Sequence, residues 1–188
     1  DDDIDDDIDD DIDDDIDDDS DDETVDITIL KGGKFTDKNL GDGADFELKR
    51  DYTVPVDYTL QNNLTIPKGR TLSVPDSVEL SVPDKITLTI KKGGSLEDDN
   101  LQLTGGTLVD ENLDGDDDED HTLEMDYTVP ADYTLQNDLT IPKGRVLTVP
   151  DSVELIVPQG KTLIIEKGGK LEDSNLQLFG GTLVDRNL

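Results

Sequence analysis

The sequence predicts an all-β chain whose short strands wind into a repetitive β-solenoid, preceded by an extended Asp-rich segment. Three observations lead to this fold class. A 75-residue unit occurs twice, leucine recurs every eighth residue inside each unit, and proline or glycine interrupts the chain too often for helices of ordinary length. Tandem modules that resemble β-sandwiches are the alternative, because short strands at regular spacing occur in both architectures.

The composition is strongly acidic and restricts the possible functions. The 188 residues include 49 acidic and 16 basic side chains, which gives a formal net charge of −33. We expect no nucleic-acid binding, because a polyanion repels phosphate, and no membrane insertion, because no apolar stretch is long enough to span a bilayer. Cysteine is absent and His121 is the single histidine, which disfavours thiolate chemistry, His-dependent catalysis and a multi-His zinc site.

The 75-residue repeat divides the chain into segments. Its two copies are identical at 49 of 63 aligned positions, and Ile27–Gly33 matches Leu88–Gly94 as part of a truncated copy. Near-identical tandem units are typical of an array, whereas a catalytic site would be expected to break the repeat, so we expect no enzyme. The predicted segments are 1–23 (acidic tetrapeptide repeat), 24–50 (truncated β repeat), 51–113 (first β repeat), 114–125 (acidic linker) and 126–188 (second β repeat).

Leucine sets an eight-residue period within each copy. Each octad reads approximately Leu-Thr-Ile-Pro-x-Gly-x-Thr, in which the first half alternates like a half-buried strand and the second half has turn residues. Three octads would make a coil of about 24 residues, with about three coils per copy and ~5 Å between coils. Two octads per coil would also suit the period. The leucines are Leu64, Leu72, Leu80, Leu88 and Leu96 in the first copy and Leu139, Leu147, Leu155, Leu163 and Leu171 in the second.

A second module has the pattern Gly-Gly-x-(Leu/Phe)-x-Asp-x-Asn-Leu. Paired glycines permit positive φ, and Asp-x-Asn supplies side-chain acceptors for nearby backbone N–H groups. We interpret the module as a tight turn between strands, with cation binding by the Asp and Asn oxygens as the alternative. It occurs at Gly32–Leu40, Gly93–Leu101, Gly105–Leu113, Gly168–Leu176 and Gly180–Leu188.

The N-terminal segment repeats the tetrapeptide Asp-Asp-Asp-Ile. Two unit charges ~4–7 Å apart repel by about 0.6–1 kcal/mol even in water, so such a segment is a solvated acidic tail unless cations neutralise it. Calcium takes about 6–8 oxygen ligands and favours carboxylates, so we expect calcium ions between ladders of aspartates. The candidate ligands are Asp1, Asp2, Asp3, Asp5, Asp6, Asp7, Asp9, Asp10, Asp11, Asp13, Asp14, Asp15, Asp17, Asp18 and Asp19.

A second acidic cluster separates the two copies. Its Asp-x-Asn-x-Asp-Gly start resembles the first half of an EF-hand calcium loop, but the twelfth position is His121 instead of glutamate and no helices are expected on either side. We expect a calcium loop between β modules, with a plain acidic linker as the alternative. The candidate ligands are Asp110, Asn112, Asp114, Asp116 and Asp118.

The sequence Asn63-Leu64-Thr65 is an acceptor motif for N-glycosylation. The second copy has Asp138 at the position of Asn63, so at most one of the two copies carries the motif.

The octads Leu-Thr-Ile-Pro-Lys-Gly-Arg and Val-Pro-Asp-Ser-Val-Glu-Leu resemble repeats of large bacterial extracellular β-helix surface proteins, over Val54–Leu96 and Val129–Leu171. The resemblance implies a secreted stalk or adhesin. Together with the acidic segment it predicts a structural subunit or stalk segment of a calcium-stabilised extracellular filament, adhesin or surface layer that associates with itself at the cell surface. An Asp-rich calcium-binding or mineral-binding module is the alternative function.

Overall fold

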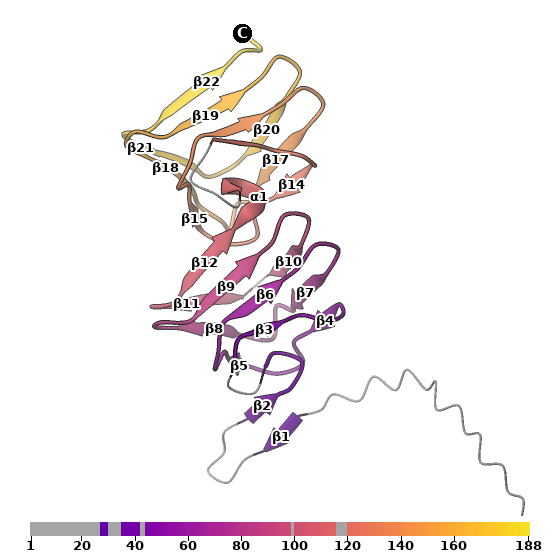
Figure 1. The fold of residues 1–188 in the computed structure, drawn as a ribbon. Helices are drawn as coiled ribbons and strands as arrows, with labels where there is room; N and C mark the ends of the chain where they lie inside the picture. Colours follow the sequence, from indigo (N-terminus) through magenta and orange to yellow (C-terminus); the bar gives the residue numbers. More distant parts are fainter. Residues whose placement is uncertain (1–26, 30–34, 42–43, 99, 116–119) are drawn as a thin grey trace, which may run out of the picture.

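The computed structural model describes residues 27–29, 35–41, 44–98, 100–115 and 120–188. These residues form an all-β chain, a solenoid of about six turns whose strands stack in parallel (Figure 1). The fold class predicted from the sequence is therefore confirmed. The acidic segment 1–23 lies outside the described residues, and its extended shape stays a prediction.

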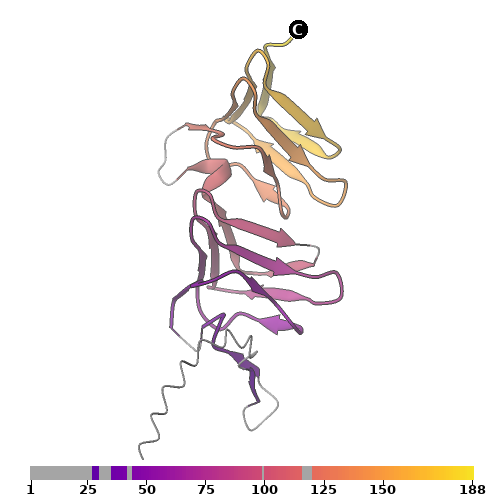
Figure 2. The ribbon, with the colours of Figure 1, turned by 90° about the vertical axis from the view of Figure 1, so that its right-hand side faces the viewer.

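The solenoid consists of two blocks, one above the other, with a short helix between them (Figure 2). In the first block three parallel sheets have the strand orders β3-β6-β9-β12, β4-β7-β10 and β5-β8-β11, so each coil contributes one strand to each side. Its elements are β3 (Phe46–Glu47), β4 (Tyr52–Thr53), β5 (Tyr58–Thr59), β6 (Leu64–Ile66), β7 (Thr71–Val74), β8 (Leu80–Pro83), β9 (Thr87–Ile90), β10 (Ser95–Asp98), β11 (Leu101–Thr104), β12 (Thr107–Asp110) and the helix α1 (Glu111–Asp114).

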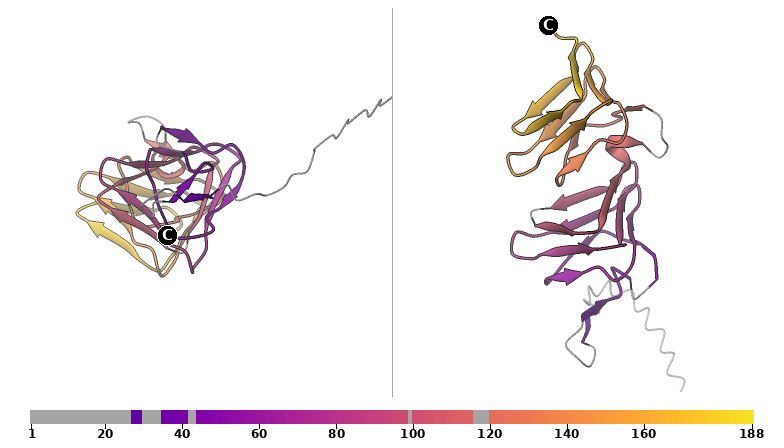
Figure 3. Two further views of the ribbon diagram at one scale, coloured as in Figure 1. Left: turned by 90° about the horizontal axis from the view of Figure 1, so that it is seen from below. Right: turned by 90° about the vertical axis from the view of Figure 1, so that its left-hand side faces the viewer.

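The second block repeats this arrangement, with the orders β13-β16-β19-β22, β14-β17-β20 and β15-β18-β21. The two blocks overlap when the molecule is seen from below (Figure 3, left). The strands are β13 (His121–Thr122), β14 (Tyr127–Thr128), β15 (Tyr133–Thr134), β16 (Leu139–Ile141), β17 (Val146–Val149), β18 (Leu155–Pro158), β19 (Thr162–Ile165), β20 (Lys170–Asp173), β21 (Leu176–Phe179) and β22 (Thr182–Asp185).

Coils of two sizes follow one another in each block. Leu64 pairs with Leu88, 24 residues later, so the middle coil contains three octads as expected and two octads per coil are excluded. The first coil is smaller, because Phe46 pairs with Leu64, 18 residues later. Its strands begin six residues apart, at Phe46, Tyr52 and Tyr58, and this six-residue period is a feature that the sequence analysis missed.

The predicted stacking of leucine on leucine forms the core. Leu64, Leu72, Leu80 and Leu88 are all 0% exposed, and one continuous apolar cluster runs through both blocks. Burial of apolar surface contributes about 25 cal/mol per Å², so this continuous strip is a main source of the solenoid's stability.

The truncated copy begins with a hairpin. Its strands β1 (Ile27–Ile29) and β2 (Phe35–Asp37) pair antiparallel, although Ile27–Gly33 matches the sequence of a parallel strand in the first block. Five residues separate β1 from β2, too few for the crossover that parallel strands require. Two strands of the blocks lie in other predicted segments, since β3 is in the truncated repeat and β13 is in the acidic linker.

The interpretation of the Gly-Gly module as a tight turn is confirmed. In all five copies the backbone N–H of the asparagine donates to the Oδ1 atom of the aspartate two residues earlier, at 2.8–3.0 Å. The second glycine allows close packing, because a Cβ atom at Gly94 would lie 2.6 Å from the Ile66 carbonyl oxygen. The pairs are Asp37–Asn39, Asp98–Asn100, Asp110–Asn112, Asp173–Asn175 and Asp185–Asn187.

Candidate functional site

A buried cluster of polar side chains lies where the first block meets the second. We call it the central interface and define it by Asp110, Asn112, Asp114, Tyr127 and Tyr133. The first three come from the end of β12 and from α1, and the two tyrosines come from β14 and β15 in the first coil of the second block (Figure 1). All five side chains are at most 8% exposed.

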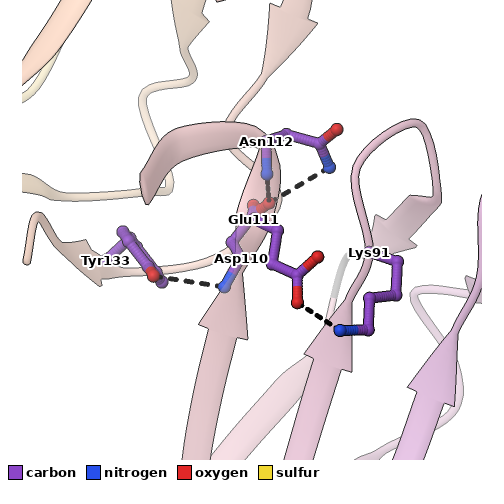
Figure 4. A network of polar contacts seen from close by, with 5 residues as sticks. All are labelled: Lys91, Asp110, Glu111, Asn112 and Tyr133. Carbon is purple, nitrogen blue, oxygen red and sulfur yellow. Dashed lines mark hydrogen bonds and ion pairs between the residues drawn. The ribbon is translucent and has the colours of Figure 1, made fainter. Parts of the chain in front are cut away.

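Local turn chemistry positions the first half of this interface. Asp110 caps α1 and accepts hydrogen bonds from the backbone N–H and the Nδ2 atom of Asn112, at 3.0 and 3.1 Å (Figure 4). Asn112 also reaches the coil beneath it, where its Oδ1 atom accepts from the Gly93 N–H at 2.8 Å and its Nδ2 atom donates to the Gly94 carbonyl at 3.2 Å. The helix is therefore fixed to the last full coil of the first block.

The two tyrosine hydroxyls join the second block to this turn. Tyr127 donates to Oδ2 of Asp110 at 2.7 Å. Tyr133 accepts from the Asp110 backbone N–H at 3.1 Å and donates to Oδ2 of Asp114 at 2.8 Å (Figure 4 shows the first of these contacts). Each hydroxyl of this buried pair therefore has a partner, which removes the cost of burying it unpaired.

Asp114 satisfies the backbone of the next coil. Its Oδ1 atom accepts from the backbone N–H groups of Gln136 and Asn137, at 2.9 and 3.0 Å, and its carbonyl accepts from Asn137 Nδ2 at 3.1 Å. The side chain is 5% exposed for the whole residue, so these bonds form in a largely water-free environment. Asp114 therefore acts as a structural cap for the second block.

Burial controls the protonation of this site. It raises the pKa of Asp110 to about 6, although hydrogen bonds from Tyr127 and Asn112 act in the opposite direction. Burial also raises the pKa of Asp114 and of both tyrosine hydroxyls, and the nearby carboxylates raise the tyrosine pKa values further. Protonated tyrosine donors therefore face predominantly ionised carboxylate acceptors at neutral pH.

Apolar and charged contacts complete the interface on the same side. Leu113 and Leu123, one from each block, are 0% and 1% exposed. Lys92 of the first block forms an exposed ion pair with Glu124 of the second, with 3.1 Å between Nζ and Oε1. The opposite side is open, because a groove of about 630 Å³ separates the blocks there; its lining includes Asp76, Asp98, Gln102, Pro130 and Asp132.

The same arrangement occurs at the start of the first block. This N-terminal interface consists of Asp37, Leu40, Tyr52, Tyr58 and Asn62. The Tyr52 hydroxyl donates to Oδ2 of Asp37, the Asp37 N–H donates to the Tyr58 hydroxyl at 3.4 Å, and Asn62 Nδ2 donates to the Leu40 carbonyl at 3.3 Å. The Asp-x-Asn-Leu turn with its two tyrosines is therefore a recurring way of joining one segment to the next.

The structure brings together three of the predicted calcium ligands. Asp110, Asn112 and Asp114 lie in one cluster, where their oxygens accept hydrogen bonds from tyrosine hydroxyls and backbone N–H groups. Among the residues that the structure describes, no group of three or more His, Cys, Asp or Glu side chains could hold a metal ion. Asp116, Asp118 and the aspartates of residues 1–19 lie outside the described residues, and calcium binding there stays a prediction.

A further set of aspartates caps the corners of the coils. Asp51, Asp57 and Asn63 lie six residues apart in the first coil, and the Oδ1 atom of each accepts a backbone N–H from the coil that follows, at 2.8–3.0 Å. The predicted glycosylation acceptor Asn63 is thus half-buried and already bonded through its side-chain oxygen. The acceptor and donor pairs are Asp51–Thr71, Asp57–Glu79 and Asn63–Thr87, and in the second block Asp126–Val146, Asp132–Glu154 and Asp138–Thr162.

The sequence analysis missed the roles of these corner aspartates and of the four tyrosines. The available signal is the sequence Asp-Tyr-Thr-Val-Pro-x-Asp-Tyr-Thr, which begins both copies and repeats Asp-Tyr after six residues. This spacing marks a coil built from hexads, in which each tyrosine faces the interface and each preceding aspartate lies at a corner.

No known protein family, curated protein or solved structure matches this chain. The β-solenoid agrees with the resemblance to β-helix repeats at the level of the fold. Within the described part of the chain, no helix combines the length and the apolar character needed to cross a membrane.

Proposed function

We propose that this chain is a non-catalytic structural segment, a stiff β-solenoid spacer within an extracellular filament, adhesin stalk or surface layer. The observation that supports this proposal is the central interface, in which a buried network of tyrosine and aspartate side chains joins two near-identical blocks. The N-terminal interface supports it further, because the same contacts recur where the first block begins. Repetition of one joining geometry is what a spacer of adjustable length requires.

The proposed role depends on resistance to bending between blocks. The parallel ladders and the leucine core make each block stiff by itself, so the blocks can move relative to one another only at the central interface. Movement there would break the bonds from Tyr127 and Tyr133 and expose Leu113. Buried hydrogen bonds to charged groups are each worth about 1.5–3 kcal/mol, so a bent state would be sparsely populated.

Spin-label distance measurements test this stiffness, and a chain without cysteine is well suited to them. Labels on Asp84→Cys and Gln159→Cys occupy equivalent exposed turns, one in each block. We expect one narrow distance distribution for the otherwise unmodified chain. The double substitution Tyr127→Phe and Tyr133→Phe should broaden it.

The matched control is the double substitution Tyr52→Phe and Tyr58→Phe, which removes the equivalent hydroxyls from the N-terminal interface and should leave the distance between blocks narrow. A broad distribution in the unmodified chain would contradict the role as a stiff spacer.

The location outside the cell is a separate part of the proposal. Antibodies raised against the purified chain should label intact cells of the source organism as strongly as permeabilised cells. Labelling that requires permeabilisation would contradict an extracellular role.

The acidic segment 1–23 is proposed to bind calcium and to promote association between chains. Its 18 acidic and no basic side chains support this proposal, since calcium favours carboxylate ligands and extracellular modules bind it at roughly 10⁻⁴–10⁻³ M. Light scattering and circular dichroism during chelation test it, with a matched variant that carries asparagine at every aspartate of residues 1–19. Association that calcium promotes only in the unmodified chain would support the proposal, and identical behaviour of both chains would contradict it. Adsorption to a calcium mineral without association of chains would instead favour the mineral-binding alternative.

A further inference from the structure

The last turn of the chain repeats the first half of the central interface. We call residues 185–188 the C-terminal turn. The Asn187 N–H donates to Oδ1 of Asp185 at 2.9 Å, its Oδ1 atom accepts from the Gly168 N–H at 2.8 Å, and its Nδ2 atom donates to the Gly169 carbonyl at 3.1 Å. Asn112 makes the same three contacts in the central interface. The C-terminal turn is therefore already formed on the coil beneath it.

The two turns differ in what covers them. Asp110 and Leu113 are both 0% exposed beneath the first coil of the second block. Their counterparts Asp185 and Leu188 are exposed, and Leu188 is exposed completely. The C-terminal turn thus presents an aspartate and a leucine in the arrangement that receives two tyrosines elsewhere in the same molecule.

From this repetition we propose that the C-terminal turn is a docking surface for the first coil of a further repeat of the second-block type, joined in cis. The two tyrosines of that coil would engage Asp185 as Tyr127 and Tyr133 engage Asp110, and they would cover Leu188. The inference rests on the proposed function as a spacer built from repeats.

Charge distinguishes this occupant from a second copy of the chain. Lys92 pairs with Glu124 across the central interface, and Lys167 holds the place of Lys92 beside the C-terminal turn. A coil of the second-block type brings a glutamate to Lys167, whereas the first block of another copy would bring Lys49. That block's Tyr52 hydroxyl is also already bonded within its own chain.

A second charge pair is preserved in reversed form. Lys91 pairs with Glu111 in the first block, and in the second block Glu166 pairs with Arg186. Both positions changed together between the copies, so the pair stays neutral. Docking on the C-terminal turn therefore buries no more net charge than docking on the central turn does.

Hydrogen exchange on a chain extended by a copy of residues 114–188 directly after Leu188 tests the proposal. The extended chain contains the whole protein and reproduces the sequence that follows Leu113. We expect the amides of residues 185–188 to exchange at least about 100-fold more slowly than in the unextended chain, approaching the rates of residues 110–113. Unchanged exchange at residues 185–188 would overturn the proposal, whether or not the added copy folds.

Two further arms identify the occupant. Phenylalanine at the added equivalents of Tyr127 and Tyr133 should remove most of the new protection, and full protection in that variant would overturn the tyrosine contacts. Protection of residues 185–188 that rises with the concentration of the unextended chain would assign the surface to a second copy and overturn docking in cis. Failure of the spacer function is a different result, a broad distance distribution between labels 84 and 159, and does not depend on exchange at the C-terminal turn.

Discussion

The central and N-terminal interfaces are built on the same plan, but the central interface has one more carboxylate. Asp114 occupies the position that Gly41 holds in the N-terminal interface. Asp114 accepts three hydrogen bonds, from Tyr133 and from two backbone N–H groups. Gly41 has a φ of +91°, and a Cβ atom there would lie 2.4 Å from Nδ2 of Asn62, so no side chain fits.

This comparison separates the essential contacts from an addition. An aspartate that accepts from one tyrosine hydroxyl, and whose N–H donates to a second, is common to both interfaces. The second carboxylate occurs only at the interface between the two full blocks. The central interface therefore holds its partner through more hydrogen bonds, and it also buries more negative charge.

The largest expected effect comes from the leucine that both interfaces bury. Leu113→Ala and Leu40→Ala each remove a side chain that is 0% exposed, so each should lower the free energy of unfolding by about 2–5 kcal/mol. Chemical denaturation measures this. Leu188→Ala is the matched control and should leave stability unchanged. A small effect of Leu113→Ala would mean that the second block does not pack on α1.

The second prediction concerns the pH dependence of the central interface. Asp110 has a pKa raised from 3.8 to about 6 in the folded chain, so the folded state binds more protons than the unfolded state between about pH 4 and pH 6. The contribution of Asp110 to the free energy of unfolding should fall by about 3 kcal/mol as pH rises through this window, at ~1.4 kcal/mol per pKa unit.

Asp110→Asn removes this titrating group, so the difference in stability between Asp110→Asn and the unmodified chain should change with pH across that window. Urea denaturation at pH 4, 5, 6 and 7 measures the difference. Asp185→Asn, in the exposed C-terminal turn, serves as the control and should retain the pH dependence of the unmodified chain. Identical pH profiles for Asp110→Asn and Asp185→Asn would show that Asp110 is not buried.

A third substitution converts the central interface toward the N-terminal one. Asp114→Ala leaves the Tyr133 hydroxyl without its acceptor and the N–H groups of Gln136 and Asn137 without theirs. We expect a loss of about 1–3 kcal/mol, because unpaired buried donors are costly, with the loss confined to the second block. Hydrogen exchange resolved by residue measures where stability falls. Uniform destabilisation of both blocks would contradict the assignment of Asp114 as a cap of the second block.

The smallest effect is expected at His121, which takes the position of Phe46 in the second block. Burial lowers the pKa of His121, so protonation destabilises the folded chain, and this cost appears as pH falls below the unfolded value of 6.5. His121→Phe should therefore change stability little at pH 7.5 and should improve it relative to the unmodified chain at pH 5. Thermal melting at the two pH values measures the effect, and an equal shift at both would contradict a buried, uncharged histidine.

Periodicity made the solenoid predictable, but the interfaces depend on contacts that periodicity does not reveal. Leu64 and Leu88 stack because three octads return the chain to the same side, and this spacing is visible in the sequence. Tyr127 and Asp110 are 17 residues apart and meet only because a hexad coil follows α1. The hexads were concealed by the stronger octad pattern.

The acidic residues show the same limit. Their abundance favoured cation binding, whereas the described members Asp51, Asp57, Asp110 and Asp114 accept hydrogen bonds from backbone N–H groups or tyrosines. Carboxylates suit both roles, and only the positions of nearby donors distinguish them. The hairpin of β1 and β2 was missed for a related reason, since Ile27–Gly33 has the sequence of a coil strand but lies five residues from its partner.

The backbone amides of Asn112 and Asn187 provide the most direct test of the central interface. Both donate to an aspartate two residues earlier in the same type of turn, but only Asn112 lies beneath the tyrosines of a following coil. Hydrogen exchange measured by NMR on the unmodified chain should show Asn112 exchanging at least about 100-fold more slowly than Asn187. Similar rates for the two amides would show that the second block does not cover α1, and would contradict the joining of the two blocks through Tyr127 and Tyr133.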